Sequence, residues 1–367
     1  MFQNLVVIFA VLLGVVTASA HEFEHSRVGY SKWAAKHGRD GSHPTPAQLM
    51  AWMQNWEFVR KQNEDKGSTW VAELNKFGDM TPAEFKEKVL MKEAFISDPK
   101  KERRNVRHPL ANTDAPTSFD WRNIGGVTPV QDQGFVGTCW TFSTVANIEG
   151  QIFQATNTTQ KLSEEYFVDC DGTSDKVLNH ADCSIYGGWP YLAYQFAIKT
   201  GGVPSEEKYP YCAGTGECMP CMNGPVDLCG PPPYSCDRTR DELCKSFVPV
   251  ASISDWRDVS TDETEIATDL VSTGPLSVLL DAHNLQFYKG GVWDGSGFNG
   301  LGRCSTTGLD HAVLITGYGE DADAGQDIHY WSVKNSWGAS WGEDGYFRIM
   351  RGTGQCGINT AVTTAIV

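Results

Sequence analysis

The sequence lacks several features that whole classes of protein require. It has no repeat of fixed period, which excludes solenoids and propellers. Basic residues are the minority, with 30 Lys and Arg against 45 Asp and Glu, and the formal net charge is −15. This balance argues against a nucleic-acid partner and against binding to an anionic membrane surface. Beyond the first twenty residues there is no second long apolar run, so we expect no membrane span in the mature form.

Cysteine is missing from the whole front of the chain, because all 11 cysteines lie at or beyond Cys139. An odd number in an exported chain leaves one thiol unpaired, and ten partners allow five disulfides in an oxidising compartment. Charge divides the chain in a similar way. Residues 1–114 carry 16 basic and 14 acidic residues (+2), whereas residues 115–367 carry 14 and 31 (−17). We therefore expect two regions with different roles.

The first twenty residues are typical of a secretory signal peptide. Leu5 to Val16 is an apolar run, and Ala18-Ser19-Ala20 supplies the small residues that signal peptidase accepts. The run is shorter than the ~20 residues of a spanning helix. No Lys or Arg precedes it, and an uncleaved anchor or a buried core helix is the alternative interpretation. The sequon Asn157-Thr158-Thr159 predicts N-glycosylation in the secretory pathway.

A small helical unit is predicted from about Ser31 to Leu90, because apolar residues recur there at three- and four-residue steps. Its long helix should run from about Thr45 to Lys66. A second helix should begin at Thr81-Pro82, with Glu84 completing a capping box. Residues 97–113 are polar and basic, which predicts an exposed linker that is open to proteolysis between roughly Asn105 and Pro116.

Three separated motifs in the acidic body carry reactive side chains. A Gly-rich turn delivers Cys139 to a helix start, where the helix dipole favours the thiolate and lowers its pKa. His311 opens a short apolar strand, and Asn335 precedes Ser-Trp-Gly. Each motif alone is weak. Together they predict a nucleophilic thiol whose proton is held and returned by His311, with Asn335 orienting the imidazole.

These motifs resemble the papain-like cysteine proteases (peptidase family C1), and the resemblance spans nearly all of residues 115–367. Phe119-Asp120-Trp121-Arg122 looks like the mature start of that family, and Gly274-Pro275-Leu276 matches another landmark. The resemblance implies an α+β, papain-like two-lobed fold, with a helical left lobe and a β-barrel-like right lobe, preceded by a helical propeptide. It also implies a monomeric cysteine-type endopeptidase that acts on protein and peptide substrates without a cofactor or metal.

By the same resemblance, residues 1–20 are a signal peptide, 21–114 an inhibitory propeptide and 115–367 the mature peptidase domain. The propeptide would be the inhibitor of its own enzyme, in a zymogen that enters a lysosome or vacuole or leaves the cell. The match favours a cathepsin L-like ancestry, although Pro44, Gln48 and Glu73 depart from the usual residues. Seven residues match the two propeptide signatures: Trp52, Asn55, Val59, Asn63, Asn75, Phe77 and Asp79.

The resemblance also assigns roles within the site. Gln133 would supply the side-chain donor of the oxyanion hole, beside the backbone N–H of Cys139. Trp337 would shield the hydrogen bond between His311 and Asn335. The pocket lining is apolar, so we expect a bulky hydrophobic side chain two residues before the cut. The substrate-binding residues would be Gly137, Gly187, Gly188, Trp189, Pro190, Leu279, Asp310, Ala312, Trp337 and Ala361.

The family pattern breaks at the cysteines. Val136 stands where the family usually has a cysteine, so its usual partner, Cys183, must pair elsewhere. The resemblance suggests the bridges Cys304–Cys356 and Cys170–Cys212, and sequence alone leaves the other pairings open. A Cys-rich insertion at residues 212–244 contains no histidine, which disfavours a dipeptidyl-carboxypeptidase activity. Within it, Cys218 and Cys221 are an alternative half of a zinc site.

Two other functions stay open. A catalytically silent relative could serve as a binding protein, but such proteins usually lose the nucleophile, and Gln133, Cys139, His311 and Asn335 are all present here. Alternatively, the insertion could narrow the cleft and restrict the enzyme to exopeptidase action. Cleavage of an end-blocked peptide at an internal bond separates these two modes.

Overall fold

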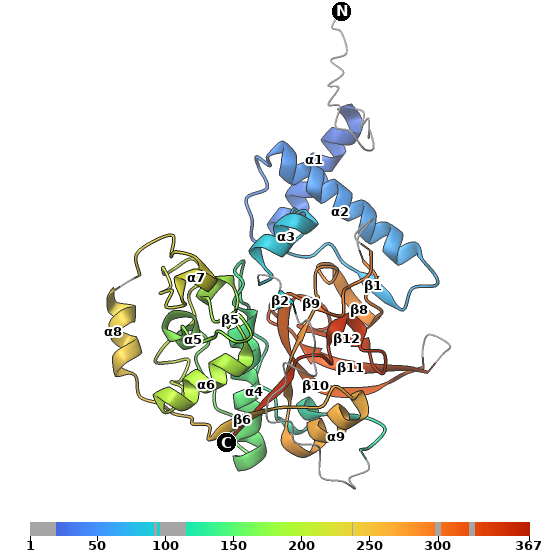
Figure 1. Cartoon of the computed structure of the whole chain (residues 1–367). Coiled ribbons are helices and arrows are strands. Elements are labelled where there is room, and N and C mark those ends of the chain that lie inside the picture. The colour runs from blue at the N-terminus through green and yellow to red at the C-terminus, as the bar shows by residue number, and fades with distance from the viewer. Residues whose placement is uncertain (1–19, 92–93, 96–114, 237, 298–301, 323–326) are drawn as a thin grey trace, which may run out of the picture.

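The structure is a computed structural model that describes residues 20–91, 94–95, 115–236, 238–297, 302–322 and 327–367. Nearly all of the predicted signal peptide and all of the predicted linker lie outside these ranges. A helical unit sits above a sheet-rich lobe, and a second, helical lobe lies beside that sheet (Figure 1). Within the described ranges, no helix has the length and apolarity that crossing a bilayer requires.

The front unit is built from helices α1 (Ala20–Lys36), α2 (Pro46–Glu64) and α3 (Pro82–Lys88). The predicted capping box at Thr81 is confirmed, and Thr45 closes a second box with Gln48 that was not predicted; a proline stands at the first helical position in both helices. The predicted helical pattern of the front unit is wrong in one place, because β1 (Trp70–Ala72) is a strand that pairs with β8 (Tyr288–Trp293) of the sheet-rich lobe. The front unit is therefore tied to the sheet lobe through backbone hydrogen bonds.

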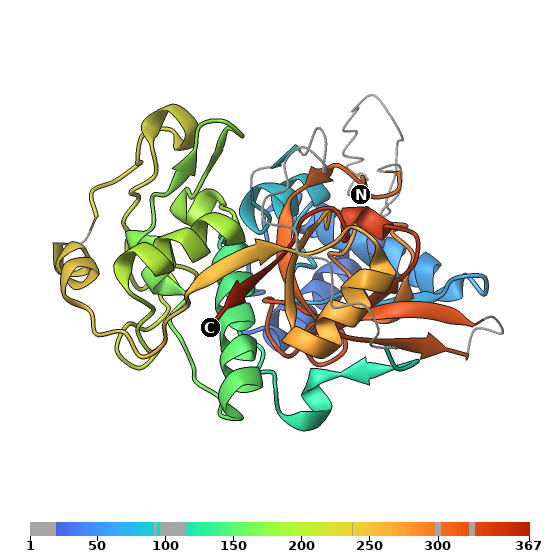
Figure 2. The ribbon, with the colours of Figure 1, turned by 60° about the horizontal axis from the view of Figure 1, so that its bottom comes forward.

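The helical lobe contains a long helix that runs between the two lobes, α4 (Cys139–Thr156), as Figure 2 shows. Short strands β4 (Ser174–Asp175) and β5 (His180–Ala181) form a hairpin on the outer side of this lobe. Its core is aromatic and holds Trp140, Tyr166, Phe167 and Tyr194. The remaining helices are α5 (Glu165–Cys170), α6 (Pro190–Thr200), α7 (Val226–Cys229) and α8 (Arg238–Ser246).

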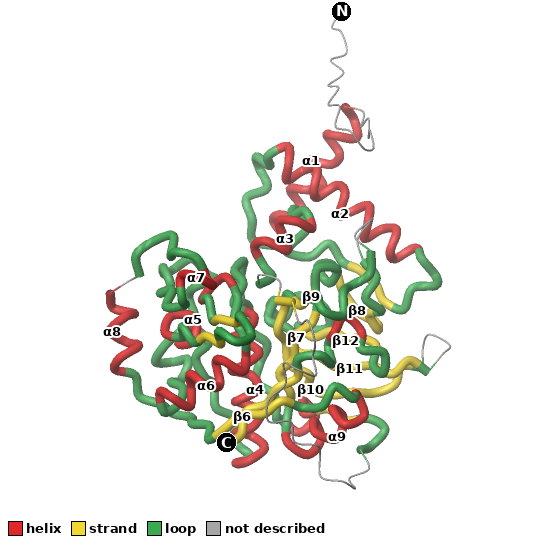
Figure 3. The backbone as a smooth tube through the Cα atoms, viewed as in Figure 1, coloured by secondary structure: helices red, strands yellow, loops and turns green. Residues whose placement is uncertain are grey.

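The other lobe is a twisted, mostly antiparallel sheet in the order β1-β8-β12-β11-β10-β7-β13-β6, with β3 paired to β10 (Figure 3). Helix α9 (Glu263–Thr273) lies beside it. The strands not yet defined are β3 (Phe119–Asp120), β6 (Asp255–Asp258), β7 (Leu276–Leu280), β9 (Gly308–Leu309), β10 (His311–Asp321), β11 (Ile328–Lys334), β12 (Tyr346–Met350) and β13 (Val362–Ile366). The predicted two-lobed α+β fold is confirmed.

The antiparallel pairing of β10 with β11 positions the two motifs of this lobe. Leu314 lies opposite Lys334, so the start of β10 is next to the end of β11. His311 is the first residue of β10 and Asn335 directly follows β11. Residues 24 apart in sequence thus meet at one edge of the sheet, which faces the start of α4.

Five disulfides join ten of the cysteines, all of which lie in described ranges. The predicted Cys304–Cys356 bridge is confirmed, and so is the expectation that Cys183 pairs elsewhere. The predicted Cys170–Cys212 bridge is wrong. Helix α8 packs against α5 and brings Cys244 to Cys170, while Cys212 closes a short loop with Cys218. The other bridges are Cys183–Cys229 and Cys221–Cys236.

The two lobes are joined through Asn147, a buried residue of α4. Its Nδ2 donates to the carbonyl of Pro275 at 2.7 Å and to Oγ1 of Thr364 at 3.2 Å. Its Oδ1 accepts from the hydroxyl of Tyr194 at 2.8 Å and from the N–H of Ala365 at 2.9 Å. One amide therefore satisfies groups on α6 and on the sheet, which makes it a structural link between the lobes.

We predict that Asn147→Ala destabilises the protein by about 3 kcal/mol or more, because several buried groups lose their partners at about 1–3 kcal/mol each. Gln154→Ala, at an exposed position of the same helix, is the matched control and should change stability by less than about 0.5 kcal/mol. Thermal unfolding of the zymogen measures both. Equal midpoints for the two variants would contradict this role of Asn147.

Candidate active site

Cys139 is the first residue of α4 and its side chain is fully buried. The loop that precedes it, residues 133–138, turns at Gly134, whose φ of +73° favours glycine. The Cys139 sulfur accepts a hydrogen bond from the backbone N–H of Ala312 at 3.4 Å. Among the eleven cysteines of the described ranges, Cys139 is the one outside a disulfide, as the odd count predicts.

His311 directly precedes Ala312, whose N–H binds the thiol, and its ring is held by two partners. Its Nε2 donates to Oδ1 of Asn335 at 2.8 Å, and the indole of Trp337 stacks on the imidazole with ring centroids 4.7 Å apart. Nδ1 of His311 is buried and has no hydrogen-bond partner among the described residues. The asparagine and the indole therefore fix the ring while Nδ1 stays available for a proton.

Gln133 is also fully buried, and each end of its amide is engaged. Its Nε2 donates at 2.8 Å to the carbonyl of Val136 in its own loop and at 2.8 Å to the carbonyl of Val89. Its Oε1 accepts from the hydroxyl of Ser336 at 2.6 Å. Val89 belongs to the front unit, so a peptide carbonyl from that unit already occupies this side-chain donor.

Residues 89–91 of the front unit lie across the site. The N–H of Met91 donates to the carbonyl of Asp310 at 2.9 Å. Gly137 leaves room for this segment, because a Cβ there would lie 3.0 Å from the carbonyl oxygen of Leu90. Sequence analysis missed this segment. The available signal was its position, since Val89-Leu90-Met91 is an apolar triplet directly after a capped helix.

Aromatic side chains attach the front unit beside the site. Phe77 and Phe85 both meet Trp337 edge-on, with ring centroids 5.6 Å and 5.3 Å away. Trp341 packs against the same indole at 4.8 Å. Edge-to-face pairs of this kind add about 0.5–1.5 kcal/mol each beyond the area that they bury. The indole of Trp337, which stacks on His311, is thus part of the surface on which the front unit docks.

Burial determines the charge state of the covered pair. It raises the pKa of the Cys139 thiol to about 12, against the weaker opposing effect of the hydrogen bond from Ala312. It also lowers the pKa of His311 to about 4, against the effect of the hydrogen bond to Asn335. The expectation of a lowered thiol pKa is wrong for this covered state, because desolvation outweighs the helix dipole. Both groups are neutral near pH 7.

Four of the predicted substrate-binding residues are placed by the hydrophobic cluster that also contains Met91 of the covering segment (residues 89–91). Leu279, Ala312 and Trp189 share one hydrophobic cluster with Met91, which is 3% exposed, and Ala361 packs against that cluster. Pro190 directly follows Trp189 and is the first residue of α6.

Gly187, Gly188 and Asp310 also belong to the predicted substrate-binding residues. Gly188 packs so closely on Trp140 that a Cβ would lie 2.6 Å from the indole, and Gly187 adopts φ +124° beside it. Asp310 is buried, and burial raises the pKa of its carboxyl to about 7. Of the predicted lining, Gly137 and Asp310 contact residues 89–91 directly, and Trp189, Leu279 and Ala312 share a hydrophobic cluster with Met91.

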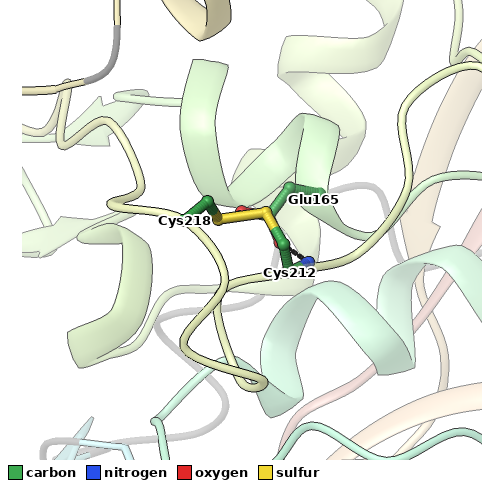
Figure 4. A group of neighbouring side chains, drawn as sticks. All are labelled: Glu165, Cys212 and Cys218. Atoms are coloured by element: carbon green, nitrogen blue, oxygen red, sulfur yellow. Dashed lines mark hydrogen bonds between the residues drawn. A yellow bond between two sulfur atoms is a disulfide. The ribbon is translucent and has the colours of Figure 1, made fainter.

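The alternative zinc site has no free thiolate to offer. Cys218 and Cys221 both lie in disulfides, to Cys212 and Cys236. Glu165 lies beside the Cys212–Cys218 bridge, where its carboxylate accepts backbone hydrogen bonds (Figure 4). A metal-binding cysteine must be a thiolate. The group of Glu165, Cys212 and Cys218 is therefore a structural, disulfide-bonded part of the fold.

A buried thiol at the start of a helix and a buried imidazole at the start of a strand of the sheet lobe, linked through the hydrogen bond from Ala312 to the sulfur, are typical of two-lobed cysteine hydrolases. The chain belongs to the papain family of cysteine proteases: the family described as "Papain family cysteine protease" matches residues 115–366. The "Cathepsin propeptide inhibitor domain (I29)" matches residues 30–85. The protein is therefore a cysteine protease zymogen with an inhibitory propeptide domain.

Relatives and solved structures agree with this assignment. The chain is 38% identical over 298 residues to Cysteine proteinase 1 of Dictyostelium discoideum, which covers 80% of this chain and 78% of that protein. It is 32% identical over 373 residues to Procathepsin L of Mus musculus, which covers 100% of both. The structure of digestive procathepsin L2 proteinase from Tenebrio molitor larval midgut superimposes with a TM-score of 0.72 at 27% identity, covering 93% and 100%.

We predict that Met91→Asp makes the zymogen leaky. An unpaired carboxylate is costly to bury in an apolar cluster, so residues 89–91 should leave the cleft for part of the time. Hydrolysis of a small end-blocked peptide by the intact zymogen at neutral pH should rise at least tenfold. Met50→Asp, at a position of α2 that is 58% exposed, is the matched control and should change nothing. An unchanged rate for Met91→Asp would contradict the seating of this segment.

Proposed function

We propose that the protein is an endopeptidase in which Cys139, His311, Asn335 and Gln133 carry out the reaction. When the propeptide leaves, water and substrate reach the pair and the cost of charging it falls, so His311 takes the proton of Cys139. The thiolate attacks the carbonyl carbon of the scissile bond. Nε2 of Gln133 and the backbone N–H of Cys139 donate to the oxyanion.

The second half of the reaction returns the site to its starting state. His311 gives its proton to the leaving amine, which breaks the C–N bond and leaves a thioester on Cys139. Water then attacks the thioester while His311 accepts its proton, and the carboxylic acid leaves as the sulfur is released. Asn335 keeps the imidazole in one orientation and tautomer throughout, through the 2.8 Å hydrogen bond at Nε2.

One observation carries this proposal: the carbonyl of Val89 accepts from Nε2 of Gln133 at 2.8 Å, close to the buried thiol. A peptide group thus already lies on the donor that the proposal assigns to the oxyanion. The neutral state of Cys139 and His311 under the propeptide supports the segment being held there without being cut.

The path of the propeptide supports internal cleavage over exopeptidase action. Before residues 89–91 in the sequence, β1 pairs with β8, and after them β2 (Ala94–Phe95) pairs with β9. The propeptide is therefore held on both sides of this segment along the chain, which supports binding of an internal stretch of substrate. The seat of Met91, with Leu279 and Ala312, favours an apolar side chain two residues before the cut.

The test is hydrolysis of end-blocked peptides by the acid-matured enzyme. Cys139→Ala should lower kcat by about 10⁴-fold or more while leaving thermal unfolding close to that of the parent. Within a substrate panel, Leu or Phe two residues before the cut should be preferred over Arg. Undiminished activity in Cys139→Ala would remove the mechanism, and a preference for Arg would overturn the pocket assignment.

We place the protein in the secretory pathway, in a lysosome or vacuole or outside the cell. Five disulfides support an oxidising compartment. Asn157 is exposed at the C-cap of α4, where its sequon would be accessible to glycosylation. The predicted signal peptide ends at Ala20, which is the first residue of α1.

Acid release of the propeptide would act through ion pairs that cross its interface. Glu73 contacts Lys289 at 3.2 Å, and Lys76 contacts Asp132 at 2.6 Å. Burial raises the pKa of Glu73, but its pairs with Lys36 and Lys289 outweigh burial and leave the pKa below the usual 4.5. A carboxyl group whose pKa is lowered on docking stabilises the docked propeptide at pH values above the usual pKa of the group. This stabilisation is lost as the pH falls through the lowered pKa.

We predict that Glu73→Gln speeds conversion of the zymogen about two- to fivefold at pH 6, since a partly exposed ion pair contributes little more than this. The rates of the variant and the parent should converge as the pH falls through the lowered pKa of Glu73, because protonation removes the charge that Gln lacks. Glu64→Gln, which breaks a pair within α2, is the control. Time courses of propeptide loss measure all three. An identical pH profile for Glu73→Gln and the parent would refute the role of this pair.

A further inference from the structure

The Cys-rich insertion, residues 212–244, contacts the loop that carries Gln133. Gly214 lies backbone against backbone on Gln133 and Gly134, so closely that a methyl group at Gly214 would overlap the carbonyl of Gln133. The hydroxyl of Tyr211, just before the insertion, donates to that same carbonyl at 2.7 Å. One end of the Gln133 loop (residues 133–138) is therefore supported from the insertion side.

A disulfide and a buried carboxylate hold Gly214 in this position (Figure 4). Cys212 and Cys218 close a short loop around it. Glu165 of α5 is fully buried, and its Oε2 accepts from the N–H of Cys212 at 2.9 Å and from the N–H of Ala213 at 3.0 Å. The backbone just before Gly214 is thus fixed to α5, and the Cys212–Cys218 bridge ties the segment after Gly214 to the same point.

The insertion also holds the segment beside the other end of the Gln133 loop. Cys229 bridges to Cys183, which begins the wall loop (residues 183–188). Within the wall loop, the carbonyl of Ile185 accepts from the N–H of Gly137 at 2.8 Å. Gly224 packs on Cys229 so closely that a methyl group would overlap its sulfur. Through this chain of contacts the insertion reaches the residue two before Cys139.

The insertion is itself anchored, so it can act as a fixed support. Arg240 of α8 contacts Asp169 at 2.6 Å and Glu165 at 3.6 Å, and both carboxylates are fully buried. Tyr209 donates to the same Asp169 at 2.8 Å. Cys170–Cys244 joins the end of α5 to α8. Buried charges that are paired in this way keep α8 and α5 in one arrangement.

We propose that the insertion is a positioning device for Gln133. Val136 cannot form a covalent tie between the Gln133 loop and Cys183, and the insertion replaces that tie with contacts at both ends of the loop. Gly214 is the positioning residue at one end, and the Cys183–Cys229 bridge acts at the other. This inference rests on the proposed role of Gln133 as an oxyanion donor, since a donor acts only when it points at the developing charge.

The first test is a double-mutant cycle between Gly214→Ala and Gln133→Ala, measured on a small end-blocked peptide with the matured enzyme. Gly214→Ala alone should lower kcat about tenfold or more and leave KM within about twofold. A displacement of Gln133 by about 1 Å weakens its contacts with the transition state more than the binding of the substrate. In the Gln133→Ala background Gly214→Ala should cost less than about twofold further. The rate at which iodoacetamide alkylates Cys139 should stay unchanged, since that reaction needs no oxyanion donor.

Controls separate positioning from general strain. Gly202→Ala creates the same kind of overlap, with the carbonyl of Ala251, and strains the helical lobe outside the insertion. It should keep kcat. If Gly214→Ala fails to fold, the pair Cys183→Ser/Cys229→Ser replaces it, with Cys221→Ser/Cys236→Ser as a control that removes a bridge within the insertion.

The outcomes distinguish this inference from the proposed function. If Gln133→Ala lowers kcat but neither Gly214→Ala nor the loss of the Cys183–Cys229 bridge does, the positioning role is wrong and the mechanism stands. If Gly214→Ala costs as much without Gln133 as with it, the insertion acts on something other than Gln133. If Gln133→Ala keeps full kcat, the oxyanion assignment fails and the inference fails with it.

Discussion

The exclusion of water from one thiol is the constraint on which the rest of the structure depends. Cys139 and His311 are completely buried, and residues 89–91 of the propeptide lie across the same site, with the carbonyl of Val89 on Gln133 and the N–H of Met91 on Asp310. Without water, charging the pair is costly, and both groups stay neutral in spite of the helix start beneath the sulfur. Under the proposed mechanism, inhibition therefore needs no chemical block of the thiol. Holding a short apolar segment in place would be sufficient, and removing that segment would restore the solvent that the charged pair requires.

The docking elements of the propeptide serve this seat. Strand β1 adds to the edge of the enzyme sheet at β8, and Trp70, Phe77 and Phe85 enter the same hydrophobic cluster as the core of the sheet lobe. Helix α3 then ends one residue before Val89, so its orientation sets where the covering segment begins. The acidic body and the ionic contacts of Glu73 add a component that weakens in acid, whereas the aromatic contacts do not depend on pH.

The sequence predicts the parts of this arrangement that depend on local chemistry. Cys139, His311 and Asn335 are found from motifs, and the capping box of Thr81 from a four-residue pattern. Gln48, which departs from the propeptide signature, completes a second box with Thr45 that was not predicted. The wrong predictions depend on distant packing. Cys170 pairs with Cys244 because α8 packs on α5, which no spacing reveals. Strand β1 is only three residues long and exists through its partner β8. The raised pKa of Cys139 comes from a segment 50 residues upstream in sequence.

The most direct measurement is the ultraviolet absorbance of the thiolate during a pH titration of the intact zymogen and of the matured enzyme. Cys139 is the one cysteine of the described ranges outside a disulfide, so the signal reports on this sulfur alone. With a pKa near 12, the zymogen should show no thiolate between about pH 5 and pH 9, and the signal should emerge on loss of the propeptide. A full thiolate signal in the uncut zymogen at pH 7 would contradict the account.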